Sequence, residues 1–506
     1  METNISNIET PNISEPAEMY KLIINELAIR KIKYCHWKSN FHLDNALSGD
    51  EDLDLLIAKN DFSEFSNLIT NYGFKEATSI NDSKQSGVHH FYANDTSTGK
   101  LLHIHAFTRI LTGDSLIKNY VLPFEDMLLS NLKFNYLIPT PIKEVELIIF
   151  LFRNSLKGLS ILDIYMMRNS YKTTLEEIEW LMDEINLEIF NDQLDKWFPD
   201  IDKNKLLQLI NEIKNSQYSF KKFRLMYSIN RELRCYKRMS NFNLILMTSR
   251  ILIRLLFWKY FLKRKYMRLK DGGKIITFIG PQAVGKSTLT REIKDWLGKE
   301  FDISSMHVGK PPPTFITAPF RLFLPLLRLL MPSQRSTQVE KEIETSQSRL
   351  KNISFIHIFR KIILAYERKV FLQKIAKKVE KRQIVICDRY PSEIIGAVDG
   401  PSFRKELINY QSSSLKKNLM SYENSLYKNI RKPDLVISLK LDKDIAVQRS
   451  IERNKPGPKD TEYVKFRHEM SAQPDFPHSK LEEIDTSLSI EKTLLSLKEL
   501  IWRNFQ

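Results

Sequence analysis

The chain has 506 residues, of which 42% are hydrophobic and 27% are charged, a composition that is typical of globular proteins and excludes extended disorder. Its formal net charge is +16, but residues 217–270 alone hold fifteen Lys and Arg against one acidic residue, Glu232. Fourteen of the sixteen excess charges therefore lie in about a tenth of the chain, which disfavours a uniform nucleic-acid-binding surface and indicates one basic segment. The length predicts roughly two to four domains.

The start of the chain and its cysteines predict a cellular compartment. Residues 1–17 are polar and lack periodicity, so we expect a disordered tail, and they lack the basic and apolar regions of a signal peptide. Cys35, Cys235 and Cys387 lie far apart and form no CxxC pair. This pattern favours a cytoplasmic protein without structural zinc.

Residues 18–140 alternate short apolar runs with helical patterns, which predicts an α+β domain. The sequences "DLDLLIA" and "KLLHIHAFT" are predicted strands, and "DFSEFSNLITNYGF" is a predicted helix that ends at Gly73. Asp52 and Asp54 are two residues apart on the first strand, so their carboxylates face the same side. Such a pair can hold Mg²⁺ over a triphosphate, although a solvent-facing strand end is the simpler alternative.

The surroundings of these carboxylates resemble the nucleotidyltransferase fold, in which a Gly-Ser turn precedes an Asp-x-Asp strand. Here Lys38-Ser39 stands thirteen residues before Asp52, with Lys38 in place of the usual Gly. The family places a third carboxylate on a later strand, for which the candidate "LLHIHAF" carries His103 and His105. The resemblance implies Asp52 and Asp54 as metal ligands, and either a metal site altered by the histidines or a domain that no longer catalyses.

Residues 141–270 are helical in pattern and poor in Gly and Pro, so we expect a helical connector that ends in the basic segment. Its stretch "FNLILMTSRILIRLLFWKYFLKRKYM" is apolar but carries Arg250, Arg254 and Lys259. Because each charge near a bilayer centre costs about 2.5–3.5 kcal/mol, a membrane-spanning helix is disfavoured.

Three roles are possible for the basic segment. One is peripheral contact of residues 217–270 with the anionic inner face of the membrane, and another is packing against an acidic partner. The third is internal packing with snorkelling arginines, an alternative shared by the apolar stretch 314–331, which carries Arg321 and Arg328.

Residues 271–506 begin with the break Asp271-Gly272-Gly273 and then alternate strands and helices. The runs "KIITFIG", "QIVICDRY" and "DLVISLKL" are continuously apolar, as in strands that are buried on both faces. We therefore expect an α/β domain with a parallel sheet flanked by helices.

The first of these strands is followed by a phosphate-loop motif, "GPQAVGKST". Gly280 and Gly285 have the required spacing, and Gln282 lies between them. Loop and helix N–H groups would point at phosphate oxygens, Lys286 would reach the β- and γ-phosphates, and Ser287 would hold Mg²⁺. The alternative is a glycine turn that binds nothing.

Two further segments supply charged candidates. Asp388 ends a buried strand, where it could bind Mg²⁺ or accept a proton, and Arg389 beside it could bind a second phosphate through both of its donor edges. A later helix carries Arg449 and Arg453 four residues apart, followed by a polar, basic loop that could close over the phosphates. The alternatives are a salt-bridged strand end and a solvated helix face.

Residues 274–502 resemble the thymidylate kinase family of P-loop nucleoside monophosphate kinases. The resemblance rests on the loop, on "DRY" at 388–390, on the "PDL" strand with its "QR…R" helix, and on the strand "EEIDTS". It implies ATP and Mg²⁺ as cofactors. The implied catalytic residues are Lys286, Asp388, Arg389 and Arg453. The implied cofactor-binding residues are Gly280, Gln282, Gly285, Lys286, Ser287, Thr288 and Arg449, with Ser287 and Asp388 at the metal.

This sequence departs from the family at the acceptor. The family usually has an Asp that is linked to the acceptor nucleotide where Gln282 stands, and "PSEIIGAVDGPSF" differs from its usual pattern after "DRY". The expected partners are a nucleotide and a phosphorylated acceptor. That acceptor is open between a nucleoside monophosphate and a phosphorylated sugar or glycan end.

We therefore expect an ATP-dependent phosphotransferase joined to a nucleotidyltransferase-like domain, a combination suited to surface-polysaccharide assembly. The alternatives are an ATP-binding switch that recognises a partner and, less favoured, a nucleic-acid-binding protein that uses residues 217–270. A homodimer stays open as an assembly state.

Overall fold

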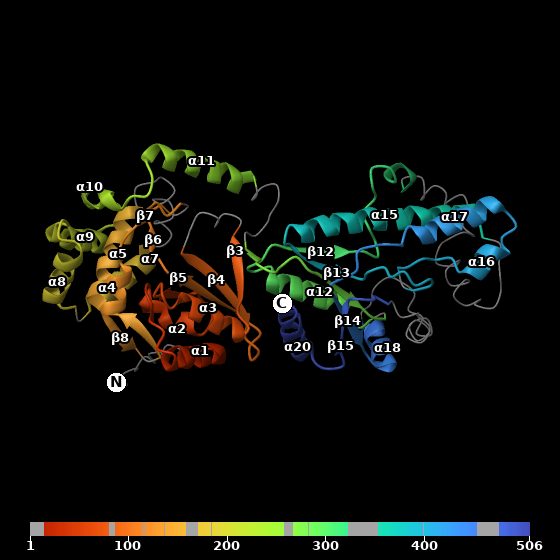
Figure 1. The fold of residues 1–506 in the computed structure, drawn as a ribbon, viewed down its shortest axis with the longest axis horizontal. Coiled ribbons are helices and arrows are strands. Elements are labelled where there is room, and N and C mark those ends of the chain that lie inside the picture. Colours follow the sequence, from red (N-terminus) through yellow and green to blue (C-terminus); the bar gives the residue numbers. More distant parts are fainter. Residues whose placement is uncertain are drawn as a thin grey trace, which may run out of the picture. The chain divides into compact units, whose positions relative to one another are not determined.

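The computed structural model describes residues 15–79, 87–114, 117–135, 137–157, 171–183, 185–257, 267–281, 283–321, 353–397, 399–452 and 475–505. The chain divides into two compact units, Met1–Arg264 and Lys265–Gln506 (Figure 1).

The first unit contains a mixed sheet in which the strands run in the order β1-β2-β5-β4-β3. β2 and β5 are parallel, whereas β1 pairs with β2, β4 with β5 and β3 with β4 in antiparallel fashion. The strands are β1 (Tyr34–His36), β2 (Leu53–Ile57), β3 (Lys75–Ser79), β4 (Val88–Asn94) and β5 (Leu101–Phe107). The predicted strands "DLDLLIA" and "KLLHIHAFT" contain β2 and β5.

Side chains alternate along these strands, so the sheet has two distinct faces. One face buries the apolar residues Leu53, Leu55, Ile104 and Ala106 against three helices. These helices are α1 (Glu18–Ile29), α2 (Leu43–Leu47) and α3 (Phe62–Asn71), and the short 3₁₀ helix η1 (Asn40–His42) precedes α2. The opposite face therefore carries the polar positions of the same strands.

A helical array follows and shares a core with that opposite face. Cys35, Trp37, Leu56 and Phe107 pack in one apolar cluster with residues from several of these helices. The helices are α4 (Glu125–Ser130), α5 (Lys143–Lys157), α7 (Tyr171–Met182), α8 (Leu187–Trp197), α9 (Lys203–Asn215), α10 (Phe220–Glu232), η3 (Leu233–Tyr236) and α11 (Asn241–Phe257). The segment expected as a connector is thus largely built into the first unit.

Two small antiparallel ribbons complete the described part of this unit. They pair β6 (Leu111–Thr112) with β7 (Tyr120–Val121), and β8 (Leu132–Asn135) with β9 (Ile138–Pro141). None of the helices in the described ranges is both long enough and apolar enough to cross a bilayer.

The second unit contains a parallel sheet in the order β12-β13-β11-β14-β15. After the short β10 (Met267–Leu269), its strands are β11 (Ile275–Ile279), β12 (Ile303–His307), β13 (Ile384–Asp388), β14 (Leu435–Lys440) and β15 (Lys480–Asp485). β11, β13 and β14 fall within the three apolar runs of the sequence. All five residues of β13 are buried, as expected for a strand covered on both faces.

Helices cover both faces of this sheet. Leu372, Ile375 and Val379 of α15 pack with Ile275 and Val385 of the sheet, and α12 contacts β12 and β13 (Figure 1). The helices are α12 (Lys286–Leu297), α15 (Phe355–Glu380), α16 (Lys405–Tyr410), α17 (Ser414–Ser425), α18 (Lys443–Glu452) and α20 (Ile490–Arg503). α20 also packs on α12, where the rings of Trp296 and Trp502 meet edge to face. The described residues thus form the expected α/β layers.

The helical array of the first unit depends on aromatic packing. Phe152 of α5 is fully buried and lies 5.0 Å from the ring of Phe198, so Phe152→Ala leaves a cavity and should lower the free energy of unfolding of this unit by about 3–5 kcal/mol. Phe134→Ala, at a phenylalanine that is 85% exposed, should change it by less than about 0.5 kcal/mol. Urea unfolding of the full chain measures both variants, and equal effects would contradict the assigned core.

Candidate functional site

The phosphate-loop motif forms a tight turn between β11 and α12. Gly280 has φ +142°, and a Cβ there would lie 2.6 Å from the main-chain oxygen of Leu439 on β14. Gly285 caps α12 with φ +92°, a left-handed conformation that favours glycine. Both glycines are therefore required by the backbone. The turn leaves the N-terminal N–H groups of α12 at the carboxyl edge of the sheet, which is where phosphates bind.

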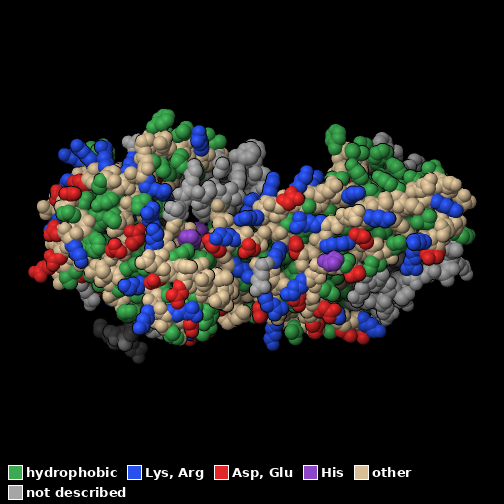
Figure 2. Space-filling model, viewed as in Figure 1, with side chains coloured by type: hydrophobic (Ala, Val, Ile, Leu, Met, Phe, Trp, Pro, Cys, Tyr) green, Lys and Arg blue, Asp and Glu red, His purple; other side chains and the backbone are tan. Residues whose placement is uncertain are grey.

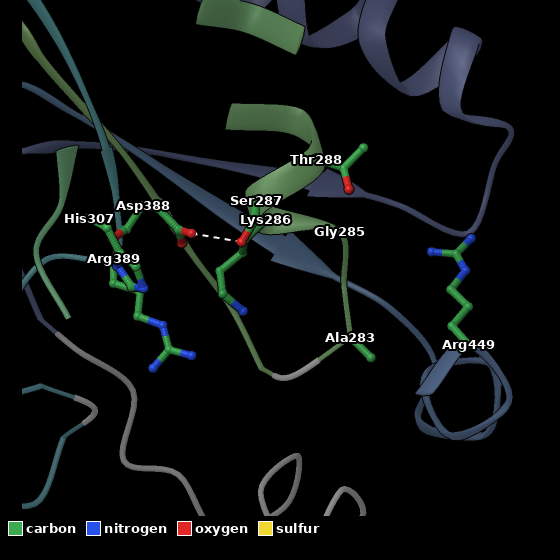
Figure 3. Close-up of a pocket in the computed structure, with 9 residues that line it drawn as sticks. All are labelled: Ala283, Gly285, Lys286, Ser287, Thr288, His307, Asp388, Arg389 and Arg449. Carbon is green, nitrogen blue, oxygen red and sulfur yellow. Dashed lines mark hydrogen bonds between the residues drawn. The ribbon is translucent and has the colours of Figure 1, made fainter. Parts of the chain in front are cut away.

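Lys286 and Ser287 begin α12 and take up defined positions. The Lys286 ammonium donates to the carbonyl oxygens of Gly280, at 2.9 Å, and Pro281. The Ser287 hydroxyl donates to Oδ2 of Asp388 at 2.8 Å (Figure 3). The sequence-predicted residues of the loop and of the "DRY" strand are thus brought together.

These groups line a cavity of 270 Å³. Lys286, Ser287 and Thr288 border it, and Figure 3 shows Arg389 and Arg449 on opposite sides of it. Arg449 of α18 also donates to the carbonyl of Thr486 at 2.9 Å. The volume lies at the small end for ligand pockets, so the described residues suit the phosphate end of a nucleotide. Gln282 and Arg453, both predicted site residues, lie outside the described residues.

The residues around Ser287 suit a divalent cation. Asp388 is 9% exposed, and its Oδ1 is buried without a hydrogen-bond partner, while its Oδ2 accepts from Ser287. A buried carboxylate oxygen without a partner is costly unless a cation or donor satisfies it. Oxygen ligands of this kind are the ones that Mg²⁺ prefers, so Ser287 and Asp388 fit the predicted metal.

Beside Arg389 lies a charged network that the sequence did not reveal. Asp399 approaches Arg389 at 3.6 Å and Arg368 at 2.5 Å. Arg368 also donates to the hydroxyl of Tyr427 at 2.9 Å. Burial alone would lower the pKa of the Arg368 guanidinium, but Tyr427 and Asp399 more than offset burial and raise it. The pKa of Tyr427 rises to about 12, mainly through burial. Arg389 and Asp399 both have positive φ, at +70° and +65°.

His307 is a further cavity residue that was not predicted. It ends β12 directly beside Asp388 in the parallel register, and its Nδ1 lies 3.2 Å from the Asp388 carbonyl oxygen. The rule that ligands gather at carboxyl ends of parallel strands could have found it. The polar run "ISSMH", however, lacks the apolar signal of a buried strand.

In the first unit, Asp52 and Asp54 face the histidine-bearing side of β5. Asp54 is opposite His105 in the parallel register, with 3.1 Å between its Oδ1 and Nδ1 of the ring. Asp52 accepts from His103 Nδ1 at 2.7 Å, and His103 Nε2 lies 3.1 Å from Nδ1 of His90. The expected common side of the two carboxylates is present, but each carboxylate has a different histidine partner.

Lys38 adds a positive charge to this face. Its ammonium lies 2.9 Å from Asp54 Oδ1 and also near the rings of Trp37 and Phe107. Burial opposes the ionised form of Asp54, but Lys38 and His105 outweigh it and lower the pKa of that carboxyl. Burial likewise raises the pKa of Asp52, and the hydrogen bond from His103 more than reverses this.

A metal at Asp52 and Asp54 stays a prediction. Within the ranges that the structure describes, no set of three or more His, Cys, Asp and Glu side chains is arranged to hold a metal ion. Lys38 occupies the oxygen that a cation would need, so Mg²⁺ would have to compete with its ammonium at Asp54.

A buried chain of hydrogen bonds fixes the turn that carries Lys38. Nδ1 of His36 lies 2.7 Å from Oδ1 of Asn40, and Asn40 donates its backbone and side-chain N–H groups to Glu146 at 3.0 and 2.8 Å. Burial raises the pKa of Glu146 to about 7, although these hydrogen bonds lower it. α5 is thereby tied to the turn that carries Lys38.

His105 makes the first unit sensitive to acid. Burial lowers its pKa to about 4, although its hydrogen bond to Asp54 raises it. An unfolded chain takes up this proton near pH 6.5, so the unfolded state binds more protons between about pH 6.5 and 4, and stability falls as the pH falls through that window. By pH 5 the loss from this one group is about 2 kcal/mol. His105→Asn keeps a donor for Asp54 without titrating, and it should remove that part of the loss.

The measurement is hydrogen exchange of β2 and β5 peptides in urea, with the full chain at pH 7 and pH 5. His478→Asn, at an exposed histidine of the second unit, is the control and should leave the pH dependence of β2 and β5 unchanged. An unchanged pH dependence in His105→Asn would rule out this role of His105.

No family model and no curated protein matches the chain. Among solved structures, it is similar to a thymidylate kinase from Ehrlichia chaffeensis, at 17% identity and a TM-score of 0.23, over 45% of this chain and 98% of that chain. It is also similar to a thymidylate kinase from Candida albicans, at 18% identity and a TM-score of 0.26, over 46% and 94%.

Proposed function

We propose that the second unit transfers the γ-phosphoryl group of ATP to an acceptor. The observation that carries this proposal is the Ser287–Asp388 hydrogen bond, which joins the start of α12 to the carboxyl end of β13 beside the turn of Gly280 and Gly285. A glycine turn without a ligand would not need a lysine, a hydroxyl and a buried carboxylate to meet at one cavity.

Each group has a role in this proposal. The N–H groups at the start of α12 and the Lys286 ammonium would bind the phosphates, while Arg389 and Arg449 approach from the two sides of the cavity. Ser287 and Asp388 would hold Mg²⁺, which neutralises phosphate charge when bound. Catalysis of this kind depends mainly on positioning and on electrostatic stabilisation.

The first unit is proposed to be a nucleotidyltransferase-like domain with an altered site. What supports this is the Asp-x-Asp arrangement on β2, with Lys38 and His105 at Asp54 in place of a third carboxylate. Joined to a phosphotransferase, such a domain would suit the assembly of surface polysaccharides, and in this proposal the protein works in the cytoplasm.

The phosphotransferase proposal predicts ATP turnover that an acceptor stimulates. ADP release is measured with nucleosides, nucleoside monophosphates, sugars and sugar phosphates as acceptors. Lys286→Ala removes the ammonium at the phosphates and should lower turnover by about 10²–10³-fold. Lys294→Ala, at an exposed lysine of the same helix, should retain it. If no acceptor stimulates ADP release, the proposal fails.

We also propose that α11 binds an anionic membrane surface. Phe242, Ile245, Leu246 and Ile253 recur at helical spacing and are 40–75% exposed, so they form one apolar face (Figure 2). Arg250 is exposed at the edge of this face, and the remaining basic residues of 217–270 supply attraction to anionic lipid. Lys259 and the side chain of Arg254 lie outside the description, as does Arg328 of the second apolar stretch, whereas Arg321 pairs with Glu367.

Flotation with vesicles tests this surface. The full chain should float with vesicles that contain anionic phospholipid and not with zwitterionic ones, because both the apolar face and the basic charge contribute. The double variant Phe242→Glu/Ile245→Glu should not float with the vesicles. Phe134→Glu, at another exposed phenylalanine of the first unit, should still float. Flotation of the double variant at the wild-type level would count against α11.

A further inference from the structure

We infer that the phosphoryl acceptor is an alcohol hydroxyl that His307 deprotonates, rather than a phosphate monoester. This inference rests on the proposed phosphoryl transfer in the second unit and narrows its substrate class. Two independent features carry it: the partners of the arginines beside the cavity, and the position of His307.

The first feature is that the arginines on the Arg389 side already have an internal anion. An acceptor phosphate is normally bound by guanidinium groups with free donors. Arg368 is only 7% exposed in its side chain, and its Nη2 donates to Oδ1 of Asp399 at 2.5 Å. Its other bonds reach the Asp399 carbonyl and the Tyr427 hydroxyl, both at 2.9 Å, and the Gly309 carbonyl at 3.3 Å.

The same carboxylate faces Arg389, the arginine that lines the cavity. Asp399 Oδ2 lies 3.6 Å from Arg389 Nη1 and is buried without a hydrogen-bond partner. A phosphate dianion at Arg389 would be repelled by this negative charge. An uncharged hydroxyl-bearing acceptor meets no such repulsion.

The backbone at Gly309 lies close to both of these charged side chains. A Cβ on Gly309 would lie 3.1 Å from Cδ of Arg389, 3.2 Å from Oδ2 of Asp399 and 3.0 Å from Cε1 of His307. The backbone at Gly309 therefore packs against all three side chains, so the contact between Arg389 and Asp399 is part of the packed structure.

The second feature is His307, which lines the same cavity as Arg389 and can act as a base. The Asp388 carbonyl oxygen only accepts hydrogen bonds, so Nδ1 of His307 carries the hydrogen of their 3.2 Å contact. In the neutral imidazole Nε2 is then an acceptor. His307 is exposed and lines the cavity (Figure 3). Among the described lining residues, His307 and Asp388 have side chains that can accept a proton, and Asp388 is bonded to Ser287.

A base matters for one class of acceptor only. A phosphate monoester presents an oxygen that is already anionic, whereas an alcohol must lose a proton as it attacks. The hydroxyl oxygen forms a bond to the γ-phosphorus of ATP, and the bond from that phosphorus to the β–γ bridging oxygen breaks. ADP leaves with the electron pair, and the hydroxyl proton passes to Nε2 of His307.

The bond formed in the product tests the inference. The full-length protein is incubated with ATP, Mg²⁺ and matched acceptors: thymidine and its 5′-monophosphate, and glucose and its 6-phosphate. ³¹P NMR then distinguishes a new phosphate ester from a phosphoanhydride. We expect an ester. A phosphoanhydride would overturn the inference while leaving phosphoryl transfer intact, and no product with any acceptor would overturn both.

Two variants test the residues. His307→Asn keeps a donor for the Asp388 carbonyl but lacks the base, so kcat for the alcohol should fall by about 10²–10⁴-fold while the KM for ATP stays unchanged. His478→Asn, at an exposed histidine, should retain full activity. Asp399→Asn removes the internal anion, so phosphoanhydride should appear when monophosphates are supplied. Wild-type kcat in His307→Asn, or no phosphoanhydride from Asp399→Asn, would contradict the inference.

Discussion

The parallel register between β13 and its two neighbours determines where Asp388 lies relative to the phosphate loop and His307. Asp388 pairs with Phe278 of β11 on one side and with His307 of β12 on the other. The carboxylate of Asp388 therefore emerges at the level of the phosphate loop, on the face that α12 covers, where Ser287 can reach it. A shift of one residue would turn Asp388 to the opposite face and would separate its carboxylate from Ser287 and the loop.

Local patterns in the sequence predicted a large part of this arrangement. The glycine spacing and the apolar runs around β11, β13 and β14 specify a turn and buried strands through short-range rules, and the structure places Lys286, Ser287 and Asp388 together as expected. The contacts of Asp399 with Arg368 and Arg389 were not predictable, because they join separate segments and depend on positive φ at two of the three residues. His307 was missed because the edge strand β12 is half-exposed and mixed in composition.

The two units use carboxylates in opposite ways. In the second unit, Asp388 keeps one buried oxygen without a hydrogen-bond partner, where the proposed Mg²⁺ would bind. In the first unit, the alternation along β2 correctly predicted that Asp52 and Asp54 share a side, but the sequence could not show that the turn after β1 brings Lys38 to Asp54. That contact depends on the pairing of β1 with β2 and on the Asn40–Glu146 hydrogen bonds, which join residues more than a hundred positions apart.

The carbonyl partners of Lys286 have a consequence for the resting state of the site. Burying the Lys286 ammonium would be energetically costly if it had no hydrogen-bond acceptor. Here the carbonyls of Gly280 and Pro281 accept its hydrogen bonds, so the loop itself satisfies the ammonium when no ligand is bound. In the proposed function, an incoming phosphate would replace these two oxygens as the partner of the Lys286 ammonium. Binding would then exchange one set of hydrogen-bond acceptors for another and would not require Lys286 to pass through a state without an acceptor.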